Sequence, residues 1–199
     1  LHRPDARYTL FLCRSERLYR LYCRLTRTPP VTQGLIVSSL TRTVILSEPG
    51  IRRMRRRTGG DPRHSRFEGS LAAAIAHEVA HLQAASAVGP RRNRSLPAWK
   101  SEGWADYSAH RARILEDASY NLARRVALLQ DDARWGGPDP SIDRRHFRWQ
   151  LLVEFLVDVK GSRFADLVED GITEGDAWAE LTAWLDEHGP KTAAPSSTY

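Results

Sequence analysis

The segment Ser70–Ala85, with the sequence SLAAAIAHEVAHLQAA, decides the fold of this 199-residue chain. It contains no Gly or Pro and consists almost entirely of residues that are well tolerated in helices. Ile75, Val79 and Leu82 recur at the spacing of an apolar stripe that one side of a helix buries. The segment therefore predicts a helix that packs against the rest of the protein and ends before Gly89.

Two histidines of this helix, His77 and His81, stand four positions apart, and Glu78 directly follows the first of them. Positions i and i+4 share one face of a helix, so both imidazoles can reach a single metal ion. Glu78, on the flank of that face, can take a proton from water at an open coordination position. These residue types at this spacing are typical of a zinc site that activates water.

A catalytic zinc site uses three protein ligands, so the two histidines leave one ligand to be found. Glu102 is the best candidate, because it follows a predicted turn that runs from Gly89 to Pro97. A helix that begins near Pro97 would place Glu102 and Asp106 four positions apart on one face. Asp106 can then accept the outer N–H of a ligating imidazole, which fixes the tautomer of that ring.

Glu102 belongs to a second motif, with the sequence WKSEGWADY over Trp99–Tyr107. Together with HEVAH at His77–His81, it resembles the gluzincin superfamily of zinc peptidases, and most of all the peptidase MA-like members, whose second motif is approximately WxxEGxAxY. The resemblance implies that His77, His81 and Glu102 bind one Zn²⁺ and that Glu78 is the general base. It also implies an α+β fold, with a small N-terminal antiparallel or mixed sheet on the HExxH helix and a mainly helical C-terminal half.

The resemblance extends to the segment His146–Leu156, which matches a family helix that often carries a Tyr or His near its start. His146 stands at that position, which implies that it donates a hydrogen bond to the oxyanion formed during hydrolysis. Tyr107 and His110 are rivals for this role, because both lie close to Glu102 in sequence. An alternative for His146 is a partly exposed histidine at the start of a helix, with no catalytic role.

The function that these motifs predict is hydrolysis of a peptide or protein substrate. Endopeptidase activity is favoured over aminopeptidase activity, because Met54 is the only Met and the GxMxN element of the aminopeptidase branch is absent. Three alternatives stay open: a polar stripe on a solvated helix, a metal-bound or basic module that binds a partner without catalysis, and hydrolysis of a non-peptide bond.

Basic residues give the chain a net charge of +6 and a pI near 9.7, and the densest run is Arg52–Arg57. One interpretation of this run is a patch for nucleic acid, an anionic membrane surface or an acidic peptide. The favoured interpretation is a solvated loop in an Arg-rich protein, because no nucleic-acid motif accompanies the run.

No apolar run reaches transmembrane length, so the sequence predicts no membrane span. Members of the resembled family are often exported or anchored through an N-terminal segment. A segment of that kind ahead of Leu1 is therefore an expectation, and the compartment and the oligomeric state stay open.

Periodicity and turn residues divide the chain into further elements, and no internal repeat interrupts them. We expect one domain over residues 1–189 and a polar tail over residues 190–199. The expected strands cover residues 7–14, 34–38 and 43–46, the last two as a hairpin, and the expected helices, besides those of the motifs, cover residues 15–26, 111–135 and 173–187.

Overall fold

The computed structural model describes residues 7–27, 34–38, 42–58, 71–116, 121–130, 144–169 and 171–188. The predicted tail over residues 190–199 lies outside this set. Within the set, no helix combines the length and the apolar character needed to cross a membrane.

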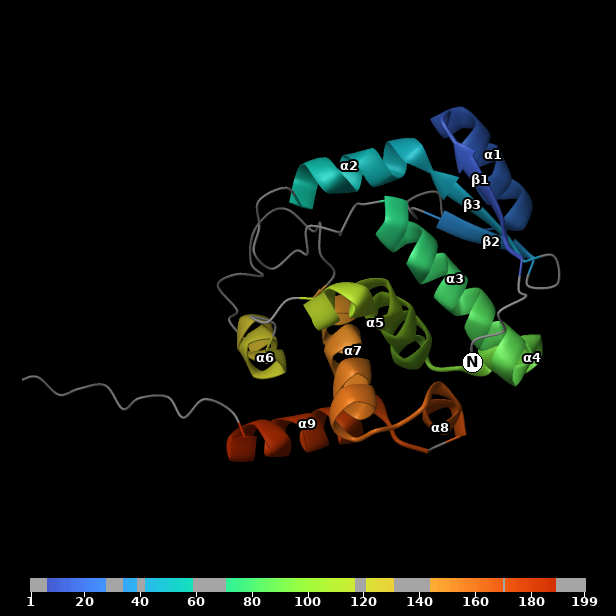
Figure 1. Ribbon diagram of the computed structural model, residues 1–199. Helices are drawn as coiled ribbons and strands as arrows, with labels where there is room; N and C mark the ends of the chain where they lie inside the picture. The colour runs from blue at the N-terminus through green and yellow to red at the C-terminus, as the bar shows by residue number, and fades with distance from the viewer. Residues whose placement is uncertain are drawn as a thin grey trace, which may run out of the picture.

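The described residues form an α+β structure, with a small sheet near the N-terminus and helices through the rest of the chain (Figure 1). The strands are β1 (Thr9–Cys13), β2 (Gly34–Ser38) and β3 (Thr43–Ser47). The helices are α1 (Glu16–Thr26), α2 (Glu48–Thr58), α3 (Leu71–Val88), α4 (Pro90–Ser95), α5 (Ala98–Glu116), α6 (Leu122–Gln130), α7 (Arg144–Glu154), the π-helical turn η2 (Phe155–Val159), α8 (Phe164–Glu169) and α9 (Glu174–His188).

The sheet is mixed and has the strand order β1-β3-β2. Strand β3 lies in the middle, parallel to β1 and antiparallel to β2, as the expected hairpin requires. Successive residues of β3 point to opposite faces of the sheet. Ile45 packs with Tyr19 and Cys23 of α1 on one face, while Val44 and Leu46 belong to a cluster with Leu82 of α3 on the other. The sheet therefore packs directly on the helix that carries the HExxH motif.

The helical half is built around α7, whose side chains from Trp149 to Val153 are all buried. Helix α5 crosses α7 closely at Gly103, where an added Cβ would lie 2.6 Å from the carbonyl oxygen of Trp149. Only a glycine allows this approach, which explains its position inside a helix. Helix α9 contributes Leu181 to the same core, and Trp178, Trp184 and Leu185 pack against it.

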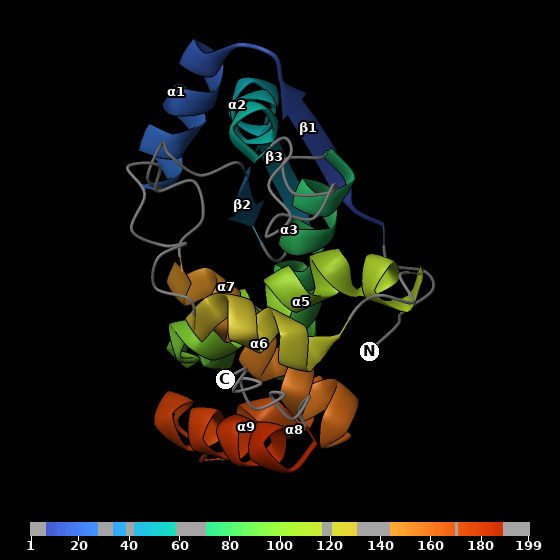
Figure 2. The same ribbon diagram turned by 90° about the vertical axis from the view of Figure 1, so that its left-hand side faces the viewer.

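Figure 2, turned by 90°, shows the sheet with α1 and α2 at one end of the molecule and α9 at the other, with α5 and α7 between them. The expected α+β class is therefore confirmed at this level: a small mixed sheet packed on α3 and a mainly helical remainder.

Three expectations about individual elements are wrong. The expected turn after Gly89 contains the short helix α4, which Pro90 begins in the first-turn position that suits proline. Within the expected single helix over residues 111–135, the described residues belong to two helices, the end of α5 and α6, because Asn121 caps a new helix by accepting a hydrogen bond from the Arg124 backbone. Residues 117–120 and 131–135 lie outside the described residues. The run Arg52–Arg57 is not a loop, since all its residues lie in α2.

Candidate metal centre

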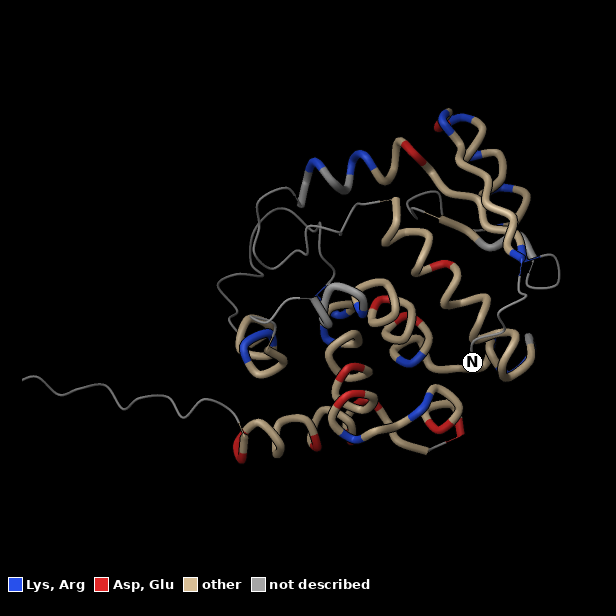
Figure 3. Tube along the Cα trace, in the orientation of Figure 1, with Lys and Arg blue, Asp and Glu red and all other residues tan. Residues whose placement is uncertain are grey.

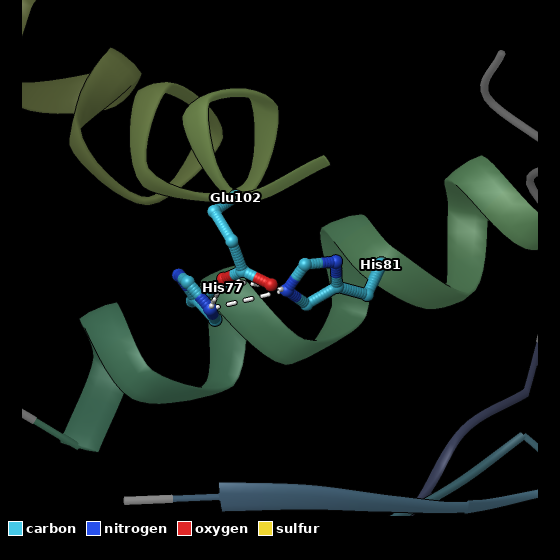
Figure 4. Close-up of side chains that lie close together, drawn as sticks. All are labelled: His77, His81 and Glu102. Atoms are coloured by element: carbon cyan, nitrogen blue, oxygen red, sulfur yellow. Dashed lines mark hydrogen bonds and ion pairs between the residues drawn. The ribbon is translucent and has the colours of Figure 1, made fainter. Parts of the chain in front are cut away.

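Helices α3 and α5 pack against each other and bring the two sequence motifs together (Figure 4). His77 and His81 project from α3 toward Glu102 of α5, and all three side chains are partly buried. Among the described residues, these three form the one group of His, Cys, Asp and Glu side chains with the proximity that metal binding needs.

The three donor atoms lie at nearly equal distances from one another. Nε2 of His77 and Nε2 of His81 are 3.2 Å apart, and each lies 3.5 Å from Oε2 of Glu102. Zinc bonds to His and Glu are about 2.1 Å long, so donors at the corners of a tetrahedron stand about 3.4 Å apart. The donor set and its spacing therefore fit Zn²⁺ with a fourth corner left open.

Both histidines have a partner for the ring nitrogen that faces away from Glu102. His77 Nδ1 donates to Oδ1 of Asp106 at 2.9 Å, and His81 Nδ1 lies 3.4 Å from the hydroxyl oxygen of Ser101. The Asp106 carboxylate can only accept, so it holds His77 in the tautomer that presents Nε2 to a metal. Sequence reasoning found Asp106 from its helical spacing but missed Ser101, although Ser101 directly precedes Glu102.

Asp106 contacts a second histidine as well. Its Oδ2 atom lies 3.2 Å from Nδ1 of His146, which comes from the start of α7. One carboxylate therefore contacts both His77 and His146. The structure places His146 beside the centre, as the resemblance implied, with its side chain about one-third exposed.

The two rivals of His146 lie in different surroundings. Tyr107 is buried, and its hydroxyl donates to Oδ1 of Asp158 at 2.8 Å. This contact points the Tyr107 hydroxyl toward η2 rather than toward the three donors. His110 is also buried on α5, one turn beyond Asp106.

Glu78 lies against the first residue of β2. A Cβ added to Gly34 would stand 2.5 Å from Oε1 of Glu78, so the carboxylate occupies the space that any larger residue at position 34 would fill. Burial raises the pKa of Glu78, and the neighbouring carboxylate of Glu102 raises it further against the opposing effect of His77 and His81. The sequence carried no signal for this contact between a strand and a helix.

The charges of the centre depend on each other. Burial alone would raise the pKa of Glu102, but hydrogen bonds from His77 and His81 outweigh it and hold this pKa well below its ordinary value. Burial alone would lower the pKa of His77. The contacts with Asp106 and Glu102 outweigh this effect, so the pKa of His77 is raised. The centre therefore keeps anionic oxygens beside the imidazoles, an arrangement that favours a bound cation.

Replacing Asp106 with asparagine is expected to lower zinc affinity by about 10–100-fold, the usual cost of losing an outer partner of a ligand. The amide keeps the shape of the carboxylate but removes the charge that faces His77. Zinc affinity can be measured by competition with a chromogenic chelator. His146→Ala is the matched control: it removes the other partner of Asp106 and should leave the affinity within a few-fold. Equal affinity in Asp106→Asn and in the unchanged chain would contradict the assignment.

Comparison of the chain with protein-family models, with curated proteins and with solved structures found no match.

Proposed function

We propose that this chain is a zinc-dependent peptide hydrolase of the gluzincin type that acts as an endopeptidase. The single observation that carries the proposal is the group of His77, His81 and Glu102 at tetrahedral spacing, with Glu78 adjoining it on α3. A solvated helix with a chance polar stripe would have no reason to meet a carboxylate of another helix at these distances. Zinc held there would polarise the scissile carbonyl and lower the pKa of water to about 7.

Two further side chains have roles in the proposed reaction, one in proton transfer and one in stabilising the oxyanion. The Glu78 carboxylate accepts the proton of the attacking water and delivers it to the leaving amine. Burial raises the pKa of Glu78, which makes its carboxylate a better proton acceptor. In its protonated, imidazolium form, His146 donates from Nδ1 to Asp106 and can donate from Nε2 to the oxyanion that forms on the substrate.

Strand β2 supports a peptide as the substrate. It lies at one end of the strand order, and its first residue touches Glu78. An extended peptide can add to such a strand through backbone hydrogen bonds, with little dependence on its side chains. A peptide bound there would run past the general base, and this mode of binding has no need of a free amino terminus. It therefore favours internal cleavage.

Gly34→Ala is expected to lower kcat by about 10–100-fold, because the added methyl group displaces the Glu78 carboxylate and a shift of 1 Å can cost that much. Zinc content should stay unchanged, because Gly34 touches no ligand in the contacts that surround it. Gly171→Ala is the matched control, since a Cβ at position 171 meets nothing. Full activity in Gly34→Ala would mean that Glu78 does not need its present position.

The experiment that tests the proposed function is hydrolysis of a peptide library, read by mass spectrometry, with and without a chelator. We expect internal cleavage that the chelator stops and added Zn²⁺ restores. Absence of cleavage by the zinc-loaded chain, across peptides of varied sequence, would reject the peptidase and favour a module that binds metal without catalysis.

A further inference from the structure

Helix α1 leaves three leucines in water. Leu18, Leu21 and Leu25 are 44%, 50% and 72% exposed, and their spacing places them on one face of the helix. The opposite part of α1 is buried, because Tyr19 and Cys23 pack on the sheet. Water therefore meets a continuous leucine stripe where a solvated helix would carry polar residues.

An arginine row runs beside this stripe on the same helix. Arg17, Arg20 and Arg24 follow a spacing of three and four residues, and all three are exposed. Going round α1, the buried face gives way first to this arginine row and then to the leucine stripe. The exposed part of α1 is thus half basic and half apolar.

Helix α2 adds its arginines to the same region. Glu16 at the start of α1 accepts a hydrogen bond from Arg20 at 2.8 Å and another from Arg53 of α2 at 2.9 Å. Glu16 therefore links the first turn of α1 to α2, and Figure 3 shows basic positions along both helices. Arg52 and Arg56 are also exposed on α2.

The charge of the chain is concentrated in this region. Residues 1–58 contain 13 Arg and three acidic residues, which gives a net charge of +10. Residues 59–199 contain 17 Lys or Arg and 21 Asp or Glu, which gives −4. The two acids among the described residues of this region, Glu16 and Glu48, already pair with arginines. The described arginines of α1 and α2 outnumber these two acids, so the two helices present a net positive charge to an external anion.

We propose that α1, together with the arginines of α2, docks this protein on an anionic membrane surface. The leucine stripe enters the boundary between headgroups and acyl chains, while the arginine row meets lipid phosphates and carboxylates. Stable attachment of a peripheral protein takes two signals, and α1 with α2 supplies an apolar face and a polybasic patch together. The inference does not rest on the proposed peptidase activity.

Other occupants fit these observations less well. Nucleic acid would satisfy the arginines but leave the three leucines in water. A second copy meeting the first through α1 would bury the leucines but place two arginine rows against each other. A membrane rich in acidic lipid satisfies both halves of the surface at once.

Vesicle flotation tests this inference, with phosphatidylcholine vesicles that contain phosphatidylserine compared with vesicles of phosphatidylcholine alone. We expect the full chain to float with the anionic vesicles and to dissociate from them as the salt concentration is raised. The triple change Leu18→Ser, Leu21→Ser and Leu25→Ser should weaken binding by about tenfold or more, because each exposed leucine loses its burial in lipid. Val159→Ser is the control, as Val159 is 39% exposed in the helical half.

The double change Arg17→Gln and Arg24→Gln tests the basic half. It should weaken binding about 25-fold at low salt, since each arginine near an anionic surface contributes about fivefold, and the difference should shrink as salt rises. Arg92→Gln, an exposed arginine of α4, is the control. Circular dichroism establishes that each variant is folded, and the altered side chains are all exposed.

Three results would overturn the inference. The first is equal binding to both kinds of vesicle, and the second is binding that the leucine changes leave intact. The third is an absence of vesicle binding. Binding of nucleic acid instead, or formation of a dimer that the leucine changes dissociate, would then identify the occupant of the surface. Glu78→Gln should float with the vesicles like the unchanged chain. A failure of the membrane proposal, seen in flotation, is therefore distinguishable from a failure of the peptidase proposal, seen in hydrolysis.

Discussion

Glu78→Gln is expected to reduce peptide hydrolysis by about 10²–10⁴-fold, the usual contribution of a general base, while zinc content stays at one ion per chain. The amide keeps the size of the carboxylate and its place against Gly34, but it cannot take a proton from water. Zinc is measured by elemental analysis and hydrolysis by release of a fluorescent peptide fragment from the same preparation. Loss of turnover with metal retained would separate the proton-transfer role from the ligand role.

The matched control for this change is Glu180→Gln, at a half-exposed position on α9 in the helical half. It makes the same chemical replacement away from the centre and should leave kcat within a few-fold of the unchanged chain. Hydrolysis by Glu78→Gln at a similar level to this control would remove Glu78 from the assigned role.

His81→Ala is expected to lower zinc affinity by more than the 10–100-fold that loss of an outer partner costs, because it removes one of three donors outright. Turnover should disappear with the metal. Zinc affinity is again measured by chelator competition. Hydrolysis is assayed in excess zinc, which distinguishes weak zinc binding from loss of hydrolysis by the zinc-loaded protein. Glu102→Gln should act in the same direction, since the amide no longer supplies an anionic oxygen.

His188→Ala is the control for the histidine change. His188 lies at the exposed end of α9, where its ring stacks on Trp184. Removing it should leave zinc content at one ion per chain. A full zinc complement in His81→Ala, equal to that in this control, would place the metal elsewhere in the protein.

The features that sequence predicted correctly are those that local spacing determines. The i, i+4 histidines are close because one helix carries them, and Asp106 reaches His77 because it stands one turn beyond Glu102. The α1 helix, expected over residues 15–26, likewise follows from local chemistry, since Ser15 at its N-cap accepts from the Leu18 backbone.

Helix α2 shows why the arginine run was misread. Arg52–Arg57 is a dense basic run with no accompanying motif, and such a pattern in an Arg-rich protein favours a solvated loop. In the structure, Ser47 accepts from the Gly50 backbone at the start of the helix, Glu48 pairs with Arg52 one turn later, and Ile51 is buried against α3. These contacts stabilise the helix at its first turns.

Contacts across distant parts of the chain had no signal in the sequence. Gly34 and Glu78 meet because β2 lies against α3, and no local pattern relates a glycine in a strand to a carboxylate 44 positions later. The bridge that Asp106 makes between His77 and His146 depends on the close crossing of α5 and α7, which Gly103 permits. Tertiary packing, rather than propensity, fixes both.

The most direct test of the central claim is anomalous diffraction from zinc-loaded crystals, with data collected on both sides of the zinc absorption edge. Zn²⁺ bound as proposed gives one strong anomalous peak within about 2.0–2.2 Å of Nε2 of His77, Nε2 of His81 and an oxygen of Glu102. Zinc-loaded crystals with no peak at this position, or with the peak on other residues, would contradict it.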